Sequence, residues 1–131
     1  MSHFLLKFNH GVEIGARLAY LGHWRRTYNA QILRIADDEE SHRLILEQML
    51  RYHKTESNKI IDNIFRLIGS SVALACKIFP LWSLNLVARS LEMFAVFSYE
   101  RLATTYPEFK EIFLKMAKAE KRHELYFKDV A

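Results

Sequence analysis

Apolar residues recur along this chain at the three- and four-residue intervals typical of amphipathic helices. The spacing predicts a first helix over residues 4–27 and a second over residues 30–53. Tyr28 and Asn29 separate them, and Asn is common in turns and at helix caps. Two long helices joined by so short a turn should pack antiparallel.

The stretch over residues 57–79 has a different character. It opens as an amphipathic segment and continues into two uncharged runs, 67–76 and 78–88, which Lys77 separates. Each run is shorter than the roughly 20 apolar residues that a membrane-spanning helix needs. We therefore expect residues 60–86 to make a peripheral membrane contact. The alternatives are that this segment only covers the bundle or forms a homodimer interface.

A second pair of helices is predicted over residues 81–104 and 108–128, with a turn at Thr105-Tyr106-Pro107. Two helices, a long crossover and two more helices make the layout of a ferritin-like four-helix bundle. With 131 residues, the chain has room for one core, so we expect a single all-α domain over residues 1–131. Only 4 Gly and 2 Pro are present, too few for a sheet with many turns.

Composition narrows the classes of function. Cys76 is the only cysteine, which excludes a disulfide within the chain, a cysteine zinc cluster and a rubredoxin-type iron centre. The net charge of +4 is spread along the helices, so we expect no nucleic acid partner, whereas attraction to an anionic membrane stays open. The N-terminal residues lack a signal-peptide pattern, which predicts a cytoplasmic protein, or one peripheral on the inner membrane face.

Two of the predicted helices carry the pattern Glu-x-x-His, at Glu39–His42 and Glu120–His123. Residues three apart share a helix face, so each pair can offer a carboxylate and an imidazole to one region of space. Both pairs fall on apolar stripes that should be buried. A carboxylate there must be protonated, ion-paired or bound to a metal.

The two halves of the chain repeat this arrangement. Glu13 precedes Glu39 by 26 positions, and Glu92 precedes Glu120 by 28. Tyr20 and Tyr99 each follow the first acid of their half by seven positions. The repetition predicts that each half brings two carboxylates and one imidazole together.

Four carboxylates and two imidazoles are the donors that bind two non-haem iron or manganese ions in helical bundles. We expect iron, with manganese as the alternative, bound by Glu13, Glu39, His42, Glu92, Glu120 and His123. Otherwise, Glu13 and Glu92 would be ion-paired helix residues, with Arg17 and Arg89 one turn away. Three other acids could take the place of a predicted ligand: Glu40, Glu100 and Glu124. We expect all three on solvated or flanking faces, and Glu100 is the strongest competitor. The remaining histidines in the helices, His10, His23 and His53, are expected at the surface or beside the ligands.

The stretch Asn9-His10-Gly11-Val12-Glu13-Ile14-Gly15-Ala16 resembles the first-helix motif of the demethoxyubiquinone hydroxylase family. Asp38-Glu39-Glu40-Ser41-His42 resembles its second-helix metal motif, and Leu91-Glu92 and Glu120-Lys121-Arg122-His123 fit its third and fourth helices. The resemblance implies a ferritin-like di-iron monooxygenase that sits on the inner face of a membrane. It implies the same six ligands.

This resemblance predicts an enzyme that uses oxygen to hydroxylate a hydrophobic quinone-precursor ring, as in ubiquinone biosynthesis. Asp38 is expected to hold a ligating histidine. Tyr20 and Tyr99 would orient ligands, carry electrons and protons, or only pack in the core. Two alternatives stay open: a soluble rubrerythrin-like or ferritin-like ferroxidase or peroxidase, and a membrane-associated helical bundle without enzymatic activity.

Overall fold

The computed structural model describes residues 3–130, and the regular structure within that range is entirely helical. The elements are α1 (Phe4–Thr27), α2 (Ala30–Tyr52), α3 (Lys59–Ala75), α4 (Leu81–Thr105), a short 3₁₀ turn η1 (Pro107–Phe109) and α5 (Lys110–Val130). The predicted all-α class is confirmed. The four long helices begin and end within about two residues of the predicted positions, because the apolar period that defines them is local.

The chain divides into two compact units, one ending at Ile78 and the other beginning at Phe79. The first unit contains α1, α2 and α3, and the second contains α4, η1 and α5. The segment predicted as a crossover therefore contains a regular helix, α3, which belongs to the first unit. The expectation of a single domain stays a prediction.

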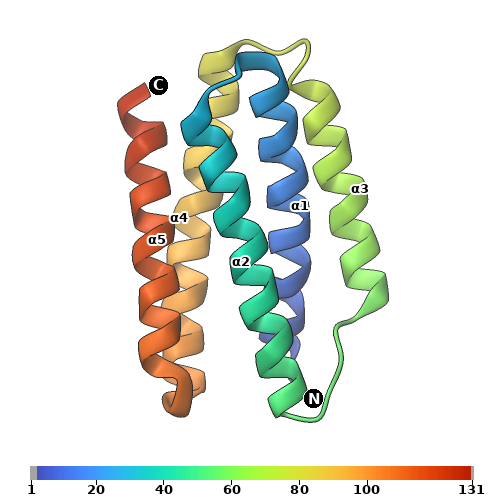
Figure 1. Cartoon of the computed structure of the whole chain (residues 1–131), viewed down its shortest axis with the longest axis vertical. Helices are drawn as coiled ribbons and strands as arrows, with labels where there is room; N and C mark the ends of the chain where they lie inside the picture. The colour runs from blue at the N-terminus through green and yellow to red at the C-terminus, as the bar shows by residue number, and fades with distance from the viewer. Residues whose placement is uncertain (1–2, 131) are drawn as a thin grey trace. The chain divides into compact units, whose positions relative to one another are not determined.

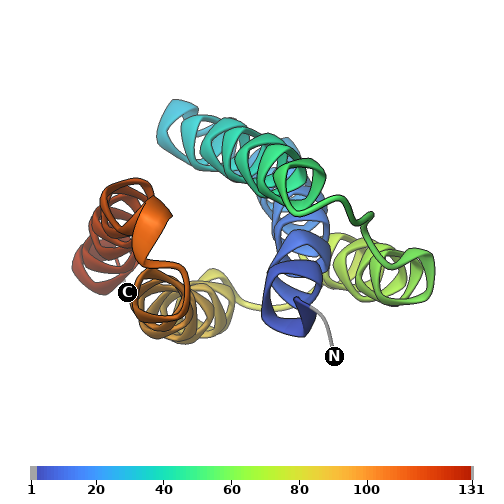
Figure 2. The same ribbon diagram turned by 90° about the horizontal axis from the view of Figure 1, so that it is seen from below.

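In the first unit, α1 lies between α2 and α3 and packs against both (Figures 1 and 2). The apolar stripe predicted on α2 is buried, as Ile32, Ile35 and Leu46 show. Leu6 of α1 is equally buried. A long stretch of α1, from Asn9 to Ala16, is buried.

Glycines let α1 and α3 approach closely. A Cβ atom at Gly22 would come within 2.5 Å of the Ala73 Cα, and one at Gly15 within 2.8 Å of the Phe65 carbonyl oxygen. A Cβ at Gly69 would collide with the backbone of Gly15 itself. These contacts involve backbone atoms, so no rotamer change can relieve them. Glycine at these positions is therefore required by helix packing.

A buried polar pair also joins α1 to α3. The Nδ1 atom of His10 lies 3.0 Å from the Asp62 Oδ1, and both side chains are almost fully buried. The surface position predicted for His10 is wrong, because its side chain lies in the interface between α1 and α3; the alternative position beside the ligands stays a prediction. Asp62 is one of only two buried residues of α3. The pair offsets the cost of burying a carboxylate and so favours one register between the two helices.

The breaks between helices have local causes. Tyr28 ends α1 in the left-handed region, at φ 51°. The Asn29 side chain accepts a hydrogen bond from the Gln31 N–H at 2.9 Å and caps α2. Asn58 caps α3 in the same way, accepting from the N–H groups of Ile60 and Ile61. Such caps satisfy donors that the first helical turn leaves unpaired.

The second unit is a hairpin of α4 and α5, which run side by side (Figure 1). Pro107 lies in the predicted turn region and is the first residue of η1, which leads into α5. Proline suits that position because it lacks the N–H that a first helical turn leaves unused. Tyr99 and Leu102 of α4 are buried with Phe113 and Phe127 of α5. The Tyr99 and Phe113 rings stack with their centroids 6.4 Å apart.

Among residues 3–130, no helix has both the length and the apolar character that crossing a membrane requires.

Candidate metal centre

In the first unit, α1 and α2 bring Glu13, Glu39 and His42 together. The His42 Nδ1 atom lies 3.6 Å from a Glu39 oxygen and 3.9 Å from a Glu13 oxygen. Glu39 and His42 are three positions apart on α2, and Glu13 reaches them from α1, which packs alongside. We call these three residues the first triad.

In the second unit, α4 and α5 bring Glu92, Glu120 and His123 together in the same pattern. The His123 Nδ1 atom lies 3.0 Å from a Glu120 oxygen and 3.5 Å from a Glu92 oxygen. Again a Glu-x-x-His pair on one helix meets a single Glu from its hairpin neighbour. We call these residues the second triad. All six sequence-predicted ligands therefore fall into two matched groups of three.

The spacing within each triad suits a shared cation. Two ligands of one ion, each about 2.0–2.2 Å from it, lie at most about 4 Å apart. All four imidazole-to-carboxylate distances, which run from 3.0 to 3.9 Å, meet that limit. In both triads the same ring nitrogen, Nδ1, faces both carboxylates. Only the 3.0 Å separation between the His123 Nδ1 and the Glu120 oxygen is of hydrogen-bond length. Without a metal, the Nδ1–H of His123 would donate to Glu120.

Burial makes the negative charges of the triads costly in free energy. The carboxylates of Glu13, Glu39, Glu92 and Glu120 are each at most 2% exposed, and both histidines are buried as well. Removing a carboxylate from water costs several kcal/mol unless a nearby positive charge compensates it. Each triad holds two such groups around one imidazole. A bound divalent cation would supply the compensating charge, and protonation of the triad is the alternative.

The ion pairs expected from Arg17 and Arg89 go to other acids. Arg17 Nε lies 3.7 Å from a Glu40 oxygen, and Arg89 Nε lies 3.8 Å from a Glu124 oxygen. Both arginines are therefore within ion-pair distance of acids outside the triads. The assignment of Glu13 and Glu92 as ligands stays a prediction.

Glu40 is engaged by arginine. The Arg43 guanidinium donates to both Glu40 oxygens, with the shortest separation, from Nη2, at 2.6 Å. These hydrogen bonds hold the pKa of the Glu40 carboxyl below its ordinary value. Arg43 also donates to Glu47 at 2.8 Å. Glu40 thus remains a charged partner of arginine on the outer side of α2, as predicted for a flanking face.

The other two competing acids differ from each other. Glu100 is exposed, so it does not displace Glu92 as the acid inside the α4–α5 hairpin. Glu124 is buried, contrary to the solvated or flanking face expected for it. Lys121 lies 3.2 Å from Glu124 and accounts for that burial together with Arg89, because the two cations compensate the carboxylate.

The residues expected to support the ligands lie on the same helices as the triads. Tyr20 and Tyr99 are both buried, whereas Asp38 is only half-buried. Their expected roles stay predictions. His23 is buried and His53 is half-buried. Cys76 is buried as well, and that burial raises the pKa of its thiol, so it packs as a small apolar residue.

Sequence reasoning missed two structural features near the first triad. One is the His10–Asp62 pair, whose only sequence signal is an acid within the otherwise apolar opening of α3. The other is the glycine contact between α1 and α3, for which the spacing of Gly11 and Gly15 by four positions was the available signal. Small residues at that spacing let helix backbones approach.

Comparison with known proteins adds no constraint. No protein-family model matches this chain, and neither a curated protein nor a solved structure matches it.

Proposed function

We propose that the two triads together bind two iron ions in a ferritin-like four-helix bundle, and that the protein is an oxygen-dependent hydroxylase. Manganese is the alternative metal. The observation that carries the proposal is the pair of matched, buried Glu/Glu/His triads, each assembled within one unit. In ferritin-like carboxylate proteins, two helices each contribute a Glu and the other two each contribute Glu-x-x-His. This chain carries that set once.

The charges of the predicted ligands support two metal ions per chain. Four carboxylates carry four negative charges, which two divalent cations balance when both imidazoles are neutral. Carboxylate and imidazole donors suit iron and manganese, and no thiolate is present among them. When bound, two such ions would supply the capacity to activate oxygen. The protein's own contribution is the ligand set and a buried surrounding that excludes water.

A hydrophobic substrate is favoured by two features. The first-helix stretch around Glu13 resembles that of enzymes acting on a quinone-precursor ring. In addition, α3 exposes Ile60, Ile64 and Leu67, each at least half exposed. We propose that this face lies on a membrane where such a substrate partitions. A homodimer interface is the alternative for the same face.

Metal content is the first test. Protein reconstituted with ferrous iron without oxygen should retain close to two ions per chain, the number that six donors of this type hold. Retention of less than about half an ion per chain would leave only the non-enzymatic bundle, because metal sites with complete ligand sets bind tightly.

Product analysis is the second test. The reduced, iron-loaded protein is given oxygen and a demethoxyquinone analogue, and products are identified by mass spectrometry. A product that carries one added hydroxyl group on the ring supports the hydroxylase. Oxidation of added ferrous iron or consumption of peroxide, with the ring unchanged, assigns the protein to the ferroxidase or peroxidase alternative.

A further inference from the structure

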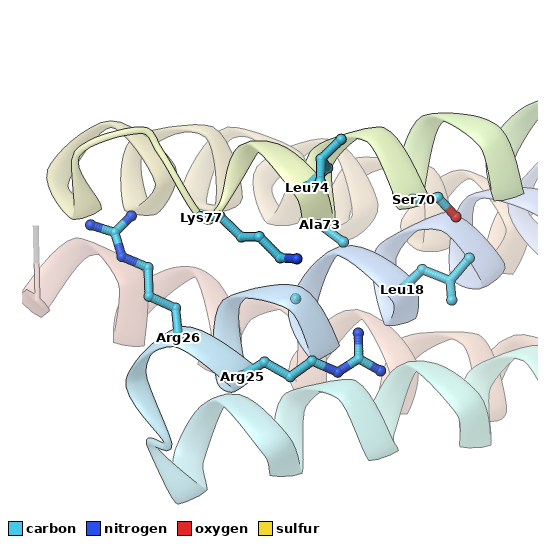
Figure 3. Close-up of a pocket in the computed structure, with 8 residues that line it drawn as sticks. Leu18, Arg25, Arg26, Ser70, Ala73, Leu74 and Lys77 are labelled. Atoms are coloured by element: carbon cyan, nitrogen blue, oxygen red, sulfur yellow. The ribbon is translucent and has the colours of Figure 1, made fainter.

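A hollow of about 460 Å³ lies in the first unit, between the C-terminal parts of α1 and α3 (Figure 3). Arg25 and Arg26, in the last turn of α1, line it together with Lys77, which follows α3. The Ser70 side chain of α3 lines the hollow as well. Its volume is within the range of small-molecule sites, which is about 300–1,000 Å³.

The hollow is strongly positive. None of the described residues that line it is acidic. Within residues 3–130, neither Arg25 nor Lys77 forms an ion pair with an acid, and Figure 3 shows both reaching into the hollow from opposite sides. Arg26 donates from Nη1 to the Cys76 carbonyl oxygen at 2.9 Å. Cations gathered around one space repel each other, and a bound anion would relieve that repulsion.

Backbone contact holds the two walls in place. Gly22 and Ala73 both line the hollow, and a Cβ atom on Gly22 would come within 2.5 Å of the Ala73 Cα. The hydrogen bond from Arg26 to Cys76 joins the ends of α1 and α3 at the same place. The cationic side chains therefore project from α1 and from the turn after α3, where the separation of the two helices is already set. Such preorganisation reduces the entropy cost of binding a ligand.

The position of the cations has a simpler partial explanation. Arginine in the last turn of a helix interacts favourably with the negative end of the helix dipole. That effect accounts for Arg25 and Arg26 at the end of α1. It does not account for Lys77, which enters the same hollow from another segment.

We propose that this hollow binds the phosphate group of a phosphorylated ligand through Arg25, Arg26 and Lys77. Phosphate carries up to two charges and presents several acceptor oxygens, which suits three cationic donors better than a carboxylate does. Leu18 and Leu74 also line the hollow, so the ligand has an apolar part beside its phosphate. A lipid headgroup and a free phosphorylated molecule share this chemistry. The proposal uses no residue of either triad and stands independently of the metal proposal.

The test titrates the intact chain with inorganic phosphate, and separately with dihexanoyl phosphatidic acid below its micelle concentration, by calorimetry at constant ionic strength. Wild type should bind at least one probe saturably. The double variant Arg25→Gln/Lys77→Gln should weaken binding about tenfold or more, since each loses a charge-assisted hydrogen bond. The matched control is Arg66→Gln/Lys59→Gln, which removes the same charges from exposed positions of α3 outside the hollow. It should bind within about twofold of wild type.

Comparison of the two probes identifies the source of the phosphate. The ligand is a lipid headgroup if the short-chain lipid binds much more tightly than inorganic phosphate and if Arg25→Gln/Lys77→Gln also weakens binding to phosphatidic acid vesicles. Equal affinity for both probes assigns a free phosphorylated molecule. The proposal is overturned if neither probe binds saturably, or if the two double variants weaken binding equally while circular dichroism shows both folded. Metal content measured on the same samples keeps this result separate from that of the triads.

Discussion

Two adjacent glutamates on α2 show how strongly a residue's surroundings determine its chemistry. Glu39 is buried beside His42 and Glu13, whereas Glu40 points to Arg43 and Arg17. Glu40 already has cationic partners in the protein. Glu39 belongs to a triad in which two carboxylates face one imidazole, so a single positive charge on the ring would not compensate both. Glu39 is therefore the better candidate ligand.

This difference predicts unequal effects of the same substitution. Glu39→Gln should weaken the affinity for iron by about 10–100-fold or more. A loss of 10–100-fold is typical even for residues that only support a ligand. Glu40→Gln, the matched control, removes the same charge one position away and should leave iron content near that of wild type. Metal analysis of the reconstituted variants measures both. Equal losses would mean that the assignment of Glu39 over Glu40 is wrong.

The contact between α1 and α3 is decided at the scale of elements. Gly22 meets the backbone of Ala73, and Gly15 meets that of Phe65, so the backbones of the two helices approach closely at these points. Most of the remaining surface of α3 is exposed, and only Asp62 and Gly69 are buried along its length. The glycine contacts and the His10–Asp62 pair therefore hold α3 in place.

We expect Gly22→Val to destabilise the first unit. The added side chain must push α3 away from α1, and such overpacking costs about 1–3 kcal/mol in the free energy of unfolding. Ser71→Val is the control, because Ser71 is exposed on α3 and the substitution should stay within about 0.5 kcal/mol. Chemical denaturation followed by circular dichroism gives both values. A Gly22→Val protein as stable as the control would show that the close approach is not required.

At the scale of the whole molecule, the donor set is divided between two compact units. Each unit holds three protein donors, and three protein ligands with solvent in the remaining position are enough to hold one ion in some metal sites. The proposal of a two-ion bundle differs from binding by each unit alone in one prediction, that metal retention by one triad depends on the other.

Removing one triad tests this prediction. Glu39→Ala/His42→Ala should lower iron content to well below one ion per chain if the proposed centre needs ligands from both triads. Glu100→Ala/His53→Ala also removes one carboxylate and one imidazole, but outside both triads, and should keep close to two ions. Retention of one full ion by the triad variant would instead show that each unit binds metal by itself.

The sequence alone determined the helices and the membership of each triad. Helix periodicity is a local property, so the positions of Ile32, Ile35 and Leu46 predicted a buried face that the structure contains. The three-residue spacing within Glu39–His42 and Glu120–His123 is likewise set by one helix. The repeat of Glu13 and Glu92 then supplied the third member of each triad, since a short turn aligns neighbouring helices.

Only the tertiary structure decided features that depend on which segments become neighbours. Nothing near Asp62 in sequence identifies His10 as its partner, and nothing near Glu124 identifies Arg89. The hollow beside Lys77 exists because α3 packs against α1 through Gly22 and Ala73. Charge compensation, close backbone approach and cavities arise between elements that are distant along the chain, and the pattern within one helix carries no information about what packs against it.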